Sequence, residues 1–174
     1  VDIKNDSKLR IIDKEAFSHS SIEKITIPPS LIRIGKFAFA YCSQFNECHI
    51  PEDSELIIIM SKAFAHSSIN SIYIPDELTV IGEGAFYWCD NLKDVKISNN
   101  SNLRIIVKFA FSFSSIESIS IPSKLRELKE GWCFCTQNLN KIDVMSYNPY
   151  YSSYNDQYII GKSCISNETY DVLV

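Results

Sequence analysis

Two His-Ser-Ser triplets, at residues 19–21 and 66–68, contain side chains that nucleophilic catalysis uses. In such a site a serine hydroxyl attacks the substrate while a histidine removes the serine proton. The triplets lie 47 residues apart, and the next position at that interval is Phe113. Because a phenylalanine cannot act as a general base, a loop or packing position explains the pattern better. No other serine, histidine and acid set stands out, so we expect no enzymatic activity.

The six cysteines are candidates for disulfides or metal binding. Cys42 and Cys89 occupy equivalent positions two repeats apart, which places them about 10 Å from each other in stacked strands, beyond the reach of a disulfide. We interpret both, and Cys48, as small buried hydrophobic residues. The Cys-Phe-Cys sequence at 133–135 has the wrong spacing for a zinc knuckle. Cys164 is unassigned, and its pairing with a cysteine of 133–135 stays open. We expect no metal and no cofactor.

Net charge, hydrophobicity and sequence motifs indicate which kinds of partner and modification are possible. The net charge of −4, without a basic run longer than a pair, argues against nucleic acid. The longest aliphatic stretch, Leu56 to Met60, is too short to span a membrane. Three Asn-X-Ser/Thr sequences permit glycosylation at Asn5, Asn99 and Asn167. About two such sequences arise by chance in a chain of this composition, so they do not argue for glycosylation.

The 47-residue interval contains two copies of a shorter repeat. The pattern [ILF]-x-x-[ILVC]-x-[IV] begins at six positions that are 23, 24, 23, 24 and 23 residues apart: Ile22, Phe45, Ile69, Leu92, Ile116 and Leu139. Even spacing of this kind predicts stacked coils that contact only their neighbours, and its length is typical of leucine-rich repeats.

Each repeat contains the parts of one coil. Alternating apolar residues predict a short strand, and in four repeats a proline ends it. An Ala-Phe pair recurs beside it, in which the small alanine allows coils to approach closely and the phenylalanine fills the interior. We therefore predict a single file of five rings: Phe17, Phe39, Phe64, Phe86 and Phe111. Trp132 and Cys133 replace the pair in the sixth repeat, where we expect local repacking.

The segment LTVIGEGAFYWCDNLKDVKIS, from Leu78 to Ser98, follows the repeat L-x-x-I-x-x-x-A-F-x-x-C-x-x-L-x-x-I-x-I-P up to its last proline. By this pattern, in five good copies over roughly residues 1–146, the chain resembles the BspA-like leucine-rich repeat family. The resemblance implies an α/β solenoid. It would be a leucine-rich repeat horseshoe of about six coils of 23–24 residues, with one parallel strand per coil on the concave face.

Outward-pointing strand residues would line this concave face. They are polar, of mixed charge, and include one tyrosine: Lys24, Thr26, Glu47, His49, Ser71, Tyr73, Asp94, Lys96, Ser118, Ser120, Lys141 and Asp143. A plain solvated surface and a binding surface explain this composition equally well. A deep small-molecule pocket is not expected, since no apolar cluster appears there. We take these residues as the candidate surface for a broad, shallow contact with a protein.

The repeat array is predicted to extend over residues 1–149. Val1 to Leu9 align with Val95 to Leu103, two 47-residue periods later, so the sequence is expected to begin within a strand. Residues 150–174 lack the repeat and resemble the hairpin-like insertions of this family. They are expected to lead into further repeats.

The family resemblance implies a non-enzymatic interaction module of a surface or secreted adhesin that binds host or matrix proteins. The alternative is a cytoplasmic scaffold associated with the cytoskeleton. Six cysteines without an evident pairing favour that alternative slightly, because disulfides are rare in reducing compartments. Either function requires a protein partner.

Overall fold

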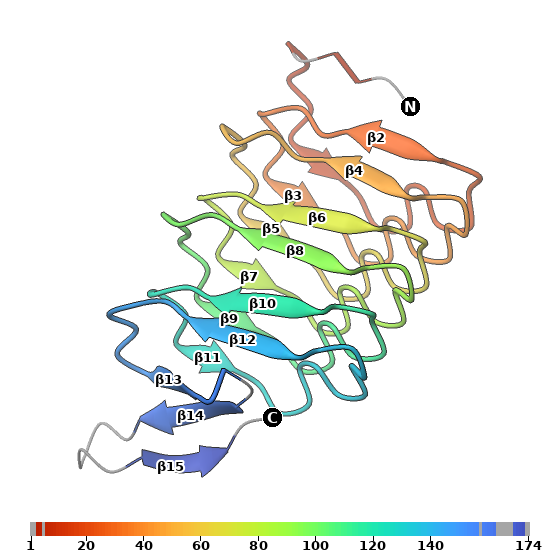
Figure 1. Cartoon of the computed structure of the whole chain (residues 1–174). Helices are drawn as coiled ribbons and strands as arrows, with labels where there is room; N and C mark the ends of the chain where they lie inside the picture. The colour runs from red at the N-terminus through yellow and green to blue at the C-terminus, as the bar shows by residue number, and fades with distance from the viewer. Residues whose placement is uncertain (1–2, 5, 157, 163–168, 173–174) are drawn as a thin grey trace.

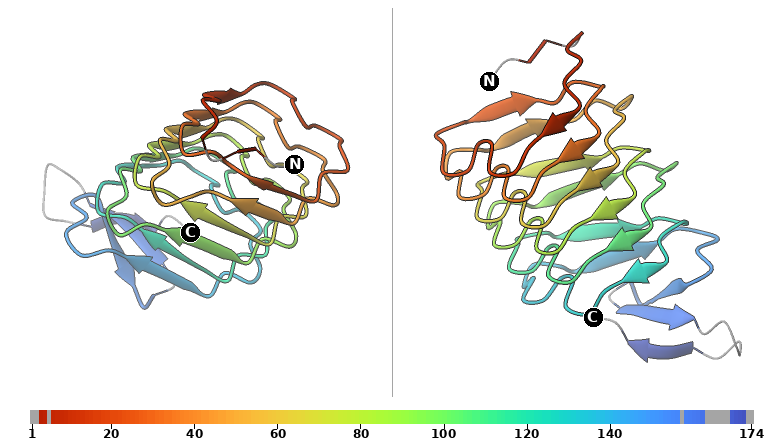
Figure 2. Two further views of the ribbon diagram at one scale, coloured as in Figure 1. Left: turned by 90° about the horizontal axis from the view of Figure 1, so that it is seen from above. Right: turned by 180° about the vertical axis from the view of Figure 1, so that it is seen from behind.

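A computed structural model describes residues 3–4, 6–156, 158–162 and 169–172. These residues form a solenoid whose coils lie on top of each other (Figures 1 and 2). One side of the solenoid carries the long strands: β2 (Lys24–Thr26), β4 (Glu47–His49), β6 (Ser71–Ile74), β8 (Asp94–Ile97), β10 (Ser118–Ile121) and β12 (Lys141–Val144). The other side carries two-residue strands: β1 (Ile11–Ile12), β3 (Arg33–Ile34), β5 (Ile58–Ile59), β7 (Val80–Ile81), β9 (Ile105–Ile106) and β11 (Glu127–Leu128).

Both sides are parallel sheets in which each coil pairs with the next. The short strands form a six-stranded sheet in chain order. The long strands form a two-stranded sheet, β2-β4, and a four-stranded sheet, β12-β10-β8-β6. Between these two, the Asn70 amide donates to the Asn46 carbonyl at 3.2 Å, so backbone pairing connects the second and third coils just before their strands.

The predicted α component is wrong for the described residues, which contain no helix. The predicted parallel strand of each coil is present as the long strand, and each coil has in addition a two-residue strand on the opposite side. Local backbone geometry explains the difference. Each short strand leads into a six-residue turn that holds two residues with positive φ, four positions apart, such as Phe37 at 57° and Tyr41 at 59°. Left-handed residues interrupt an α-helix, so the segment can form only a strand and a turn.

The predicted file of phenylalanines is confirmed. Successive ring centroids are 5.1 Å apart for Phe17 and Phe39, 5.2 Å for Phe39 and Phe64, 5.1 Å for Phe64 and Phe86, and 5.2 Å for Phe86 and Phe111. Backbone hydrogen bonds hold this register, because each of the first four phenylalanines donates its amide to the alanine carbonyl of the next coil, as Phe64 does to Ala85 at 2.8 Å. We call these five rings the phenylalanine column.

The sixth coil repacks as expected. The Phe111 amide donates to the Trp132 carbonyl at 2.8 Å, which places Trp132 in the alanine position. The Trp132 ring then meets the Phe111 ring edge-on, at 90° and 6.3 Å. A tryptophan therefore ends the stack where a sixth phenylalanine is missing.

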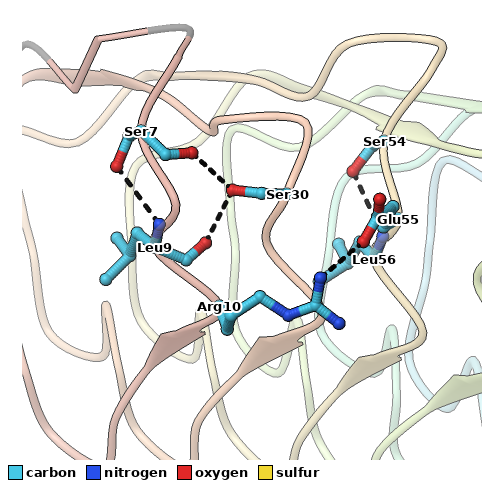
Figure 3. A network of polar contacts seen from close by, with 7 residues as sticks. All are labelled: Ser7, Leu9, Arg10, Ser30, Ser54, Glu55 and Leu56. Atoms are coloured by element: carbon cyan, nitrogen blue, oxygen red, sulfur yellow. Dashed lines mark hydrogen bonds and ion pairs between the residues drawn. The ribbon is translucent and has the colours of Figure 1, made fainter.

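A recurring serine marks the longer of the two alternating connections between a long strand and the following short strand. Ser7, Ser54 and Ser101, 47 residues apart, each accept a hydrogen bond from the amide two positions later, at 3.1–3.3 Å. In this turn, shown in Figure 3, the Ser30 hydroxyl of the next coil donates to the Ser7 carbonyl at 2.7 Å. The hydroxyls thus stabilise the longer connection between a long strand and the following short strand.

Antiparallel strands follow the last coil: β13 (Tyr151–Tyr154), β14 (Tyr158–Lys162) and β15 (Thr169–Val172). Their first residues cover the edge of the six-stranded sheet. The Tyr151 hydroxyl accepts from the Leu128 amide at 2.9 Å and donates to the Arg126 carbonyl at 3.2 Å. Buried Asn148 donates to the carbonyls of Pro122 and Leu125. The division after residue 149 and the continuation into further repeats stay predictions.

Candidate binding surfaces

The long-strand face carries the twelve residues that the sequence assigned to the concave surface. Strand register brings them into two columns. Lys24 pairs with Glu47 and Thr26 with His49. Ser71 pairs with Asp94 and Tyr73 with Lys96. Ser118 pairs with Lys141 and Ser120 with Asp143. All twelve are exposed or half-exposed.

The electrostatics of this face are mixed. Lys24 lies opposite Glu47 across neighbouring strands, and the other charged residues lie opposite uncharged ones, as Lys96 lies opposite Tyr73. Along β8 the Lys96 ammonium lies 3.6 Å from the Asp94 carboxylate, and both side chains are more than half exposed. Exposed pairs of this kind contribute little to stability, so they leave the charges available to a partner. The role of the twelve residues in binding stays a prediction.

A second surface lies along the edge that joins short strands to long strands, where Figure 1 shows a row of small loops. We call it the turn edge; it consists of six turns, residues 14–19, 36–41, 61–66, 83–88, 108–113 and 130–135. The last residue of each turn has a positive φ. In the first five turns this residue is aromatic: His19, Tyr41, His66, Trp88 and Phe113. We call these five residues the outer ladder.

The rings of the outer ladder stack from coil to coil. Centroids are 4.7 Å apart for His19 and Tyr41, 4.8 Å for Tyr41 and His66, and 4.7 Å for Trp88 and Phe113. Because neighbouring rings cover each other's faces, the ladder presents mainly ring edges and polar tips to solvent. Sequence reasoning missed this surface, since it treated the position as variable. The signal was present, because all five residues have flat rings.

The candidate catalytic triplets are built into this packing. His66 stacks between Tyr41 and Trp88, and the Ser67 hydroxyl lies 3.7 Å from the Cys89 thiol. His19 likewise stacks on Tyr41, and Ser20 lies beside Cys42. The triplets therefore stack and pack as the sequence interpretation proposed, and the structure records no serine–histidine hydrogen bond among these described residues.

The cysteines at 42 and 89 are buried hydrogen-bond donors. The Cys42 thiol donates to the Phe17 carbonyl at 2.9 Å, and the Cys89 thiol donates to the Phe64 carbonyl at 3.0 Å. Burial raises the pKa of Cys89 to about 12 and that of Cys133 to about 11. Burial also raises the pKa of Cys48. The described cysteines are free thiols, and Cys164 lies outside the described residues.

Of the three candidate glycosylation sites, the structure describes one. Asn99 is exposed in the turn after β8. Asn5 and Asn167 lie outside the described residues. Asn99 is therefore accessible to modification if the protein enters a secretory pathway.

A family model for the BspA type leucine-rich repeat region, in six copies, matches residues 1–58 and 57–168. The chain belongs to this family. Its members are repeat proteins, and leucine-rich repeats are generally non-enzymatic modules that typically mediate protein binding. No curated protein sequence matches the chain.

Several solved structures share the solenoid fold, among them two leucine-rich proteins. The pneumococcal vaccine antigen PcpA superimposes with a TM-score of 0.81 and 28% identity, over 88% of this chain and 40% of PcpA. A leucine-rich cell surface protein from Faecalibacterium prausnitzii gives 0.65 and 18%, over 90% of this chain and 47% of that protein. A leucine-rich repeat protein from Eubacterium ventriosum gives 0.60 and 22%, over 93% and 36%. This BspA-type chain therefore spans less than half of each.

The described part of the chain contains no helix that is long and apolar enough to cross a bilayer. In the same residues, no group of three or more His, Cys, Asp or Glu side chains converges as metal ligands do.

Proposed function

We propose that the chain is a non-enzymatic protein-interaction module of a surface or secreted protein that binds host or matrix proteins. The observation that carries the proposal is the long-strand face, where exposed polar side chains continue in register across coils. A continuous array of this kind suits a broad contact with a folded protein. The surface location is supported by the similarity to a pneumococcal vaccine antigen and to a cell surface protein.

The proposal is tested in two steps. Antibody against the chain should stain intact cells as strongly as permeabilised cells if the protein lies at the surface. The recombinant chain should then bind a matrix protein, such as fibronectin, laminin or collagen, in surface plasmon resonance. Staining that requires permeabilisation, or absence of binding to intact host cells and to matrix proteins, would overturn the proposal.

A charge reversal on β8 tests whether the partner protein binds to the long-strand face. Exchange of Asp94→Lys together with Lys96→Glu keeps the net charge but inverts the local pattern, and we expect about tenfold weaker binding. Arg104→Glu changes an exposed residue beside β9 on the opposite sheet and serves as the control. Equal loss in both variants would show that binding does not use the long-strand face.

The intracellular scaffold is the second candidate, and the free thiols are the observation that favours it. Burial limits that argument, however. The thiolate is the reactive form, and the raised pKa values of Cys89 and Cys133 keep it scarce in the folded protein. Buried thiols of this kind tolerate an oxidising compartment, so the staining experiment decides between the two locations.

A further inference from the structure

A hollow of about 700 Å³ lies on the turn edge between the fifth and sixth coils. Phe109 and Phe134 are its aromatic lining residues, and Gly131 lines it as well. Lys108, Lys129 and Glu130 also line it. Its two aromatic residues are among the more exposed large hydrophobic residues of the described chain, at 40% for Phe109 and 56% for Phe134. Exposed aromatic surface of this kind marks interaction sites.

The hollow exists because a side chain is missing over the Phe109 ring. The second residue of every turn has a positive φ, and four of the six are not glycine: Glu15, Phe37, Lys62 and Phe109. The backbone at this position therefore accommodates ordinary residues. A Cβ atom on Gly131 would lie 3.1 Å from Cε1 of Phe109, so a side chain there would cover the ring. Glycine leaves it open.

The equivalent position in another pair of coils shows which side chain can cover a ring of this kind. Lys62 follows Phe37 by one coil, as Gly131 follows Phe109. The Lys62 ammonium lies over the Phe37 ring, 5.5 Å from its centroid. A cation over an aromatic face is attracted by the negative potential of the ring. Among the described residues no cation lies over the Phe109 ring in this way, so the ring is open to the same contact.

Charges around the hollow favour a cationic guest. The Lys108 ammonium is paired with Glu83 at 3.6 Å, and the Lys129 ammonium with Glu127 at 2.8 Å. Within the described chain no cation lies at ion-pair distance from Glu130. Lining residues and their ion-pair partners together therefore carry one net negative charge, which belongs to Glu130.

We propose that this hollow binds an arginine side chain of a partner protein, with the guanidinium on the Phe109 ring and near the Glu130 carboxylate. Arginine fits better than lysine, because its planar guanidinium stacks on aromatic rings and bonds carboxylates through two N–H groups. Phe134 contacts the aliphatic stem of the guest. This proposal rests on the proposed function in one respect, because it takes the arginine to belong to a partner protein.

The test uses a short capped peptide, acetyl-Gly-Arg-Gly-amide, and the same peptide with citrulline, which keeps the shape of arginine but lacks its charge. NMR titration of the whole isotope-labelled chain follows the ring signals of Phe109 and Phe134. We expect millimolar binding of the arginine peptide, upfield shifts of its Cδ protons from the ring current, and weakening by salt. Equal binding of the citrulline peptide, or no shift at all, would overturn the proposal.

Variants connect the binding to the hollow. Gly131→Lys should place an internal ammonium over Phe109, as Lys62 does over Phe37, and reduce affinity about tenfold or more. If Gly131→Lys fails to fold, Phe109→Ala takes its place in the test and should reduce the affinity by a similar factor. Phe37→Ala removes a ring that is already covered and should leave affinity unchanged. Retained binding in Gly131→Lys or Phe109→Ala contradicts the site. Because the assay needs neither cells nor a matrix protein, its result is independent of the surface-location test.

Discussion

The turn edge holds two stacks of rings that lie side by side but differ in burial. In the phenylalanine column, Phe39, Phe64, Phe86 and Phe111 are 0% exposed. In the outer ladder, two residues further along the chain, Trp88 is 43% exposed. Yet the spacing is similar, at 5.2 Å for Phe39 and Phe64 and 4.8 Å for Tyr41 and His66. The distance between coils therefore sets the stacking, and burial sets which residues are accepted.

The two stacks place different demands on the sequence. Inside, a ring fills a cavity of fixed volume between coils, so the same residue returns in five coils. In the outer ladder, solvent fills the space that a smaller ring leaves, so His, Tyr, Trp and Phe all occur at this position. The interior stack is therefore restricted to phenylalanine, while the exposed stack accepts several types of ring.

The largest expected effect comes from opening the interior stack in its middle. Phe64→Ala removes a fully buried ring and should lower the free energy of unfolding by about 3–5 kcal/mol. Urea unfolding followed by circular dichroism measures it, with comparable m-values as a condition. Phe17→Ala, at the half-buried end of the same column, should cost roughly half as much. Equal losses at both positions would contradict a gradient of burial along the column.

The sequence predicted those features that repeat with the same residue. The period, the stacked coils and the phenylalanine column all follow from recurrent Ile, Leu, Ala and Phe. The α component was wrong because φ values decide it, and Phe37 or Tyr41 gives no sign in the sequence of a left-handed backbone. The outer ladder was missed because its residue types vary. The hollow at Gly131 depends on an absent side chain beside Phe109, which only the register of neighbouring coils reveals.

A smaller effect is expected from the outer stack. Trp88→Ala removes a ring that stacks on His66 and Phe113 but stays partly exposed. We expect a loss of roughly 1–2 kcal/mol, since about half of the ring is buried and each aromatic contact adds a little more. The same urea experiment measures this loss. A loss as large as that of Phe64→Ala would show that the ladder belongs to the core.

The smallest expected effect concerns Cys89, which joins the two stacks. Its neighbour Trp88 belongs to the outer ladder, and its thiol donates to the carbonyl of Phe64 in the column. Burial raises its pKa from 9.0 to about 12. The folded state therefore keeps the proton that the unfolded state loses above pH 9. The contribution of the Cys89 thiol to the free energy of unfolding is fully present below pH 9 and is lost as the pH rises toward 12.

Urea unfolding at pH 8 and pH 10 measures this loss, because ionisation of the unfolded Cys89 thiol should cost about 1 kcal/mol at the higher pH. Cys89→Ser is the matched variant. Serine occurs naturally in this position of another coil, where the Ser114 hydroxyl donates to the Phe111 carbonyl at 2.6 Å. The variant should fold and should lose less stability between the two pH values than the unchanged chain. An identical pH dependence would mean that the thiol ionises as easily between the stacks as in water.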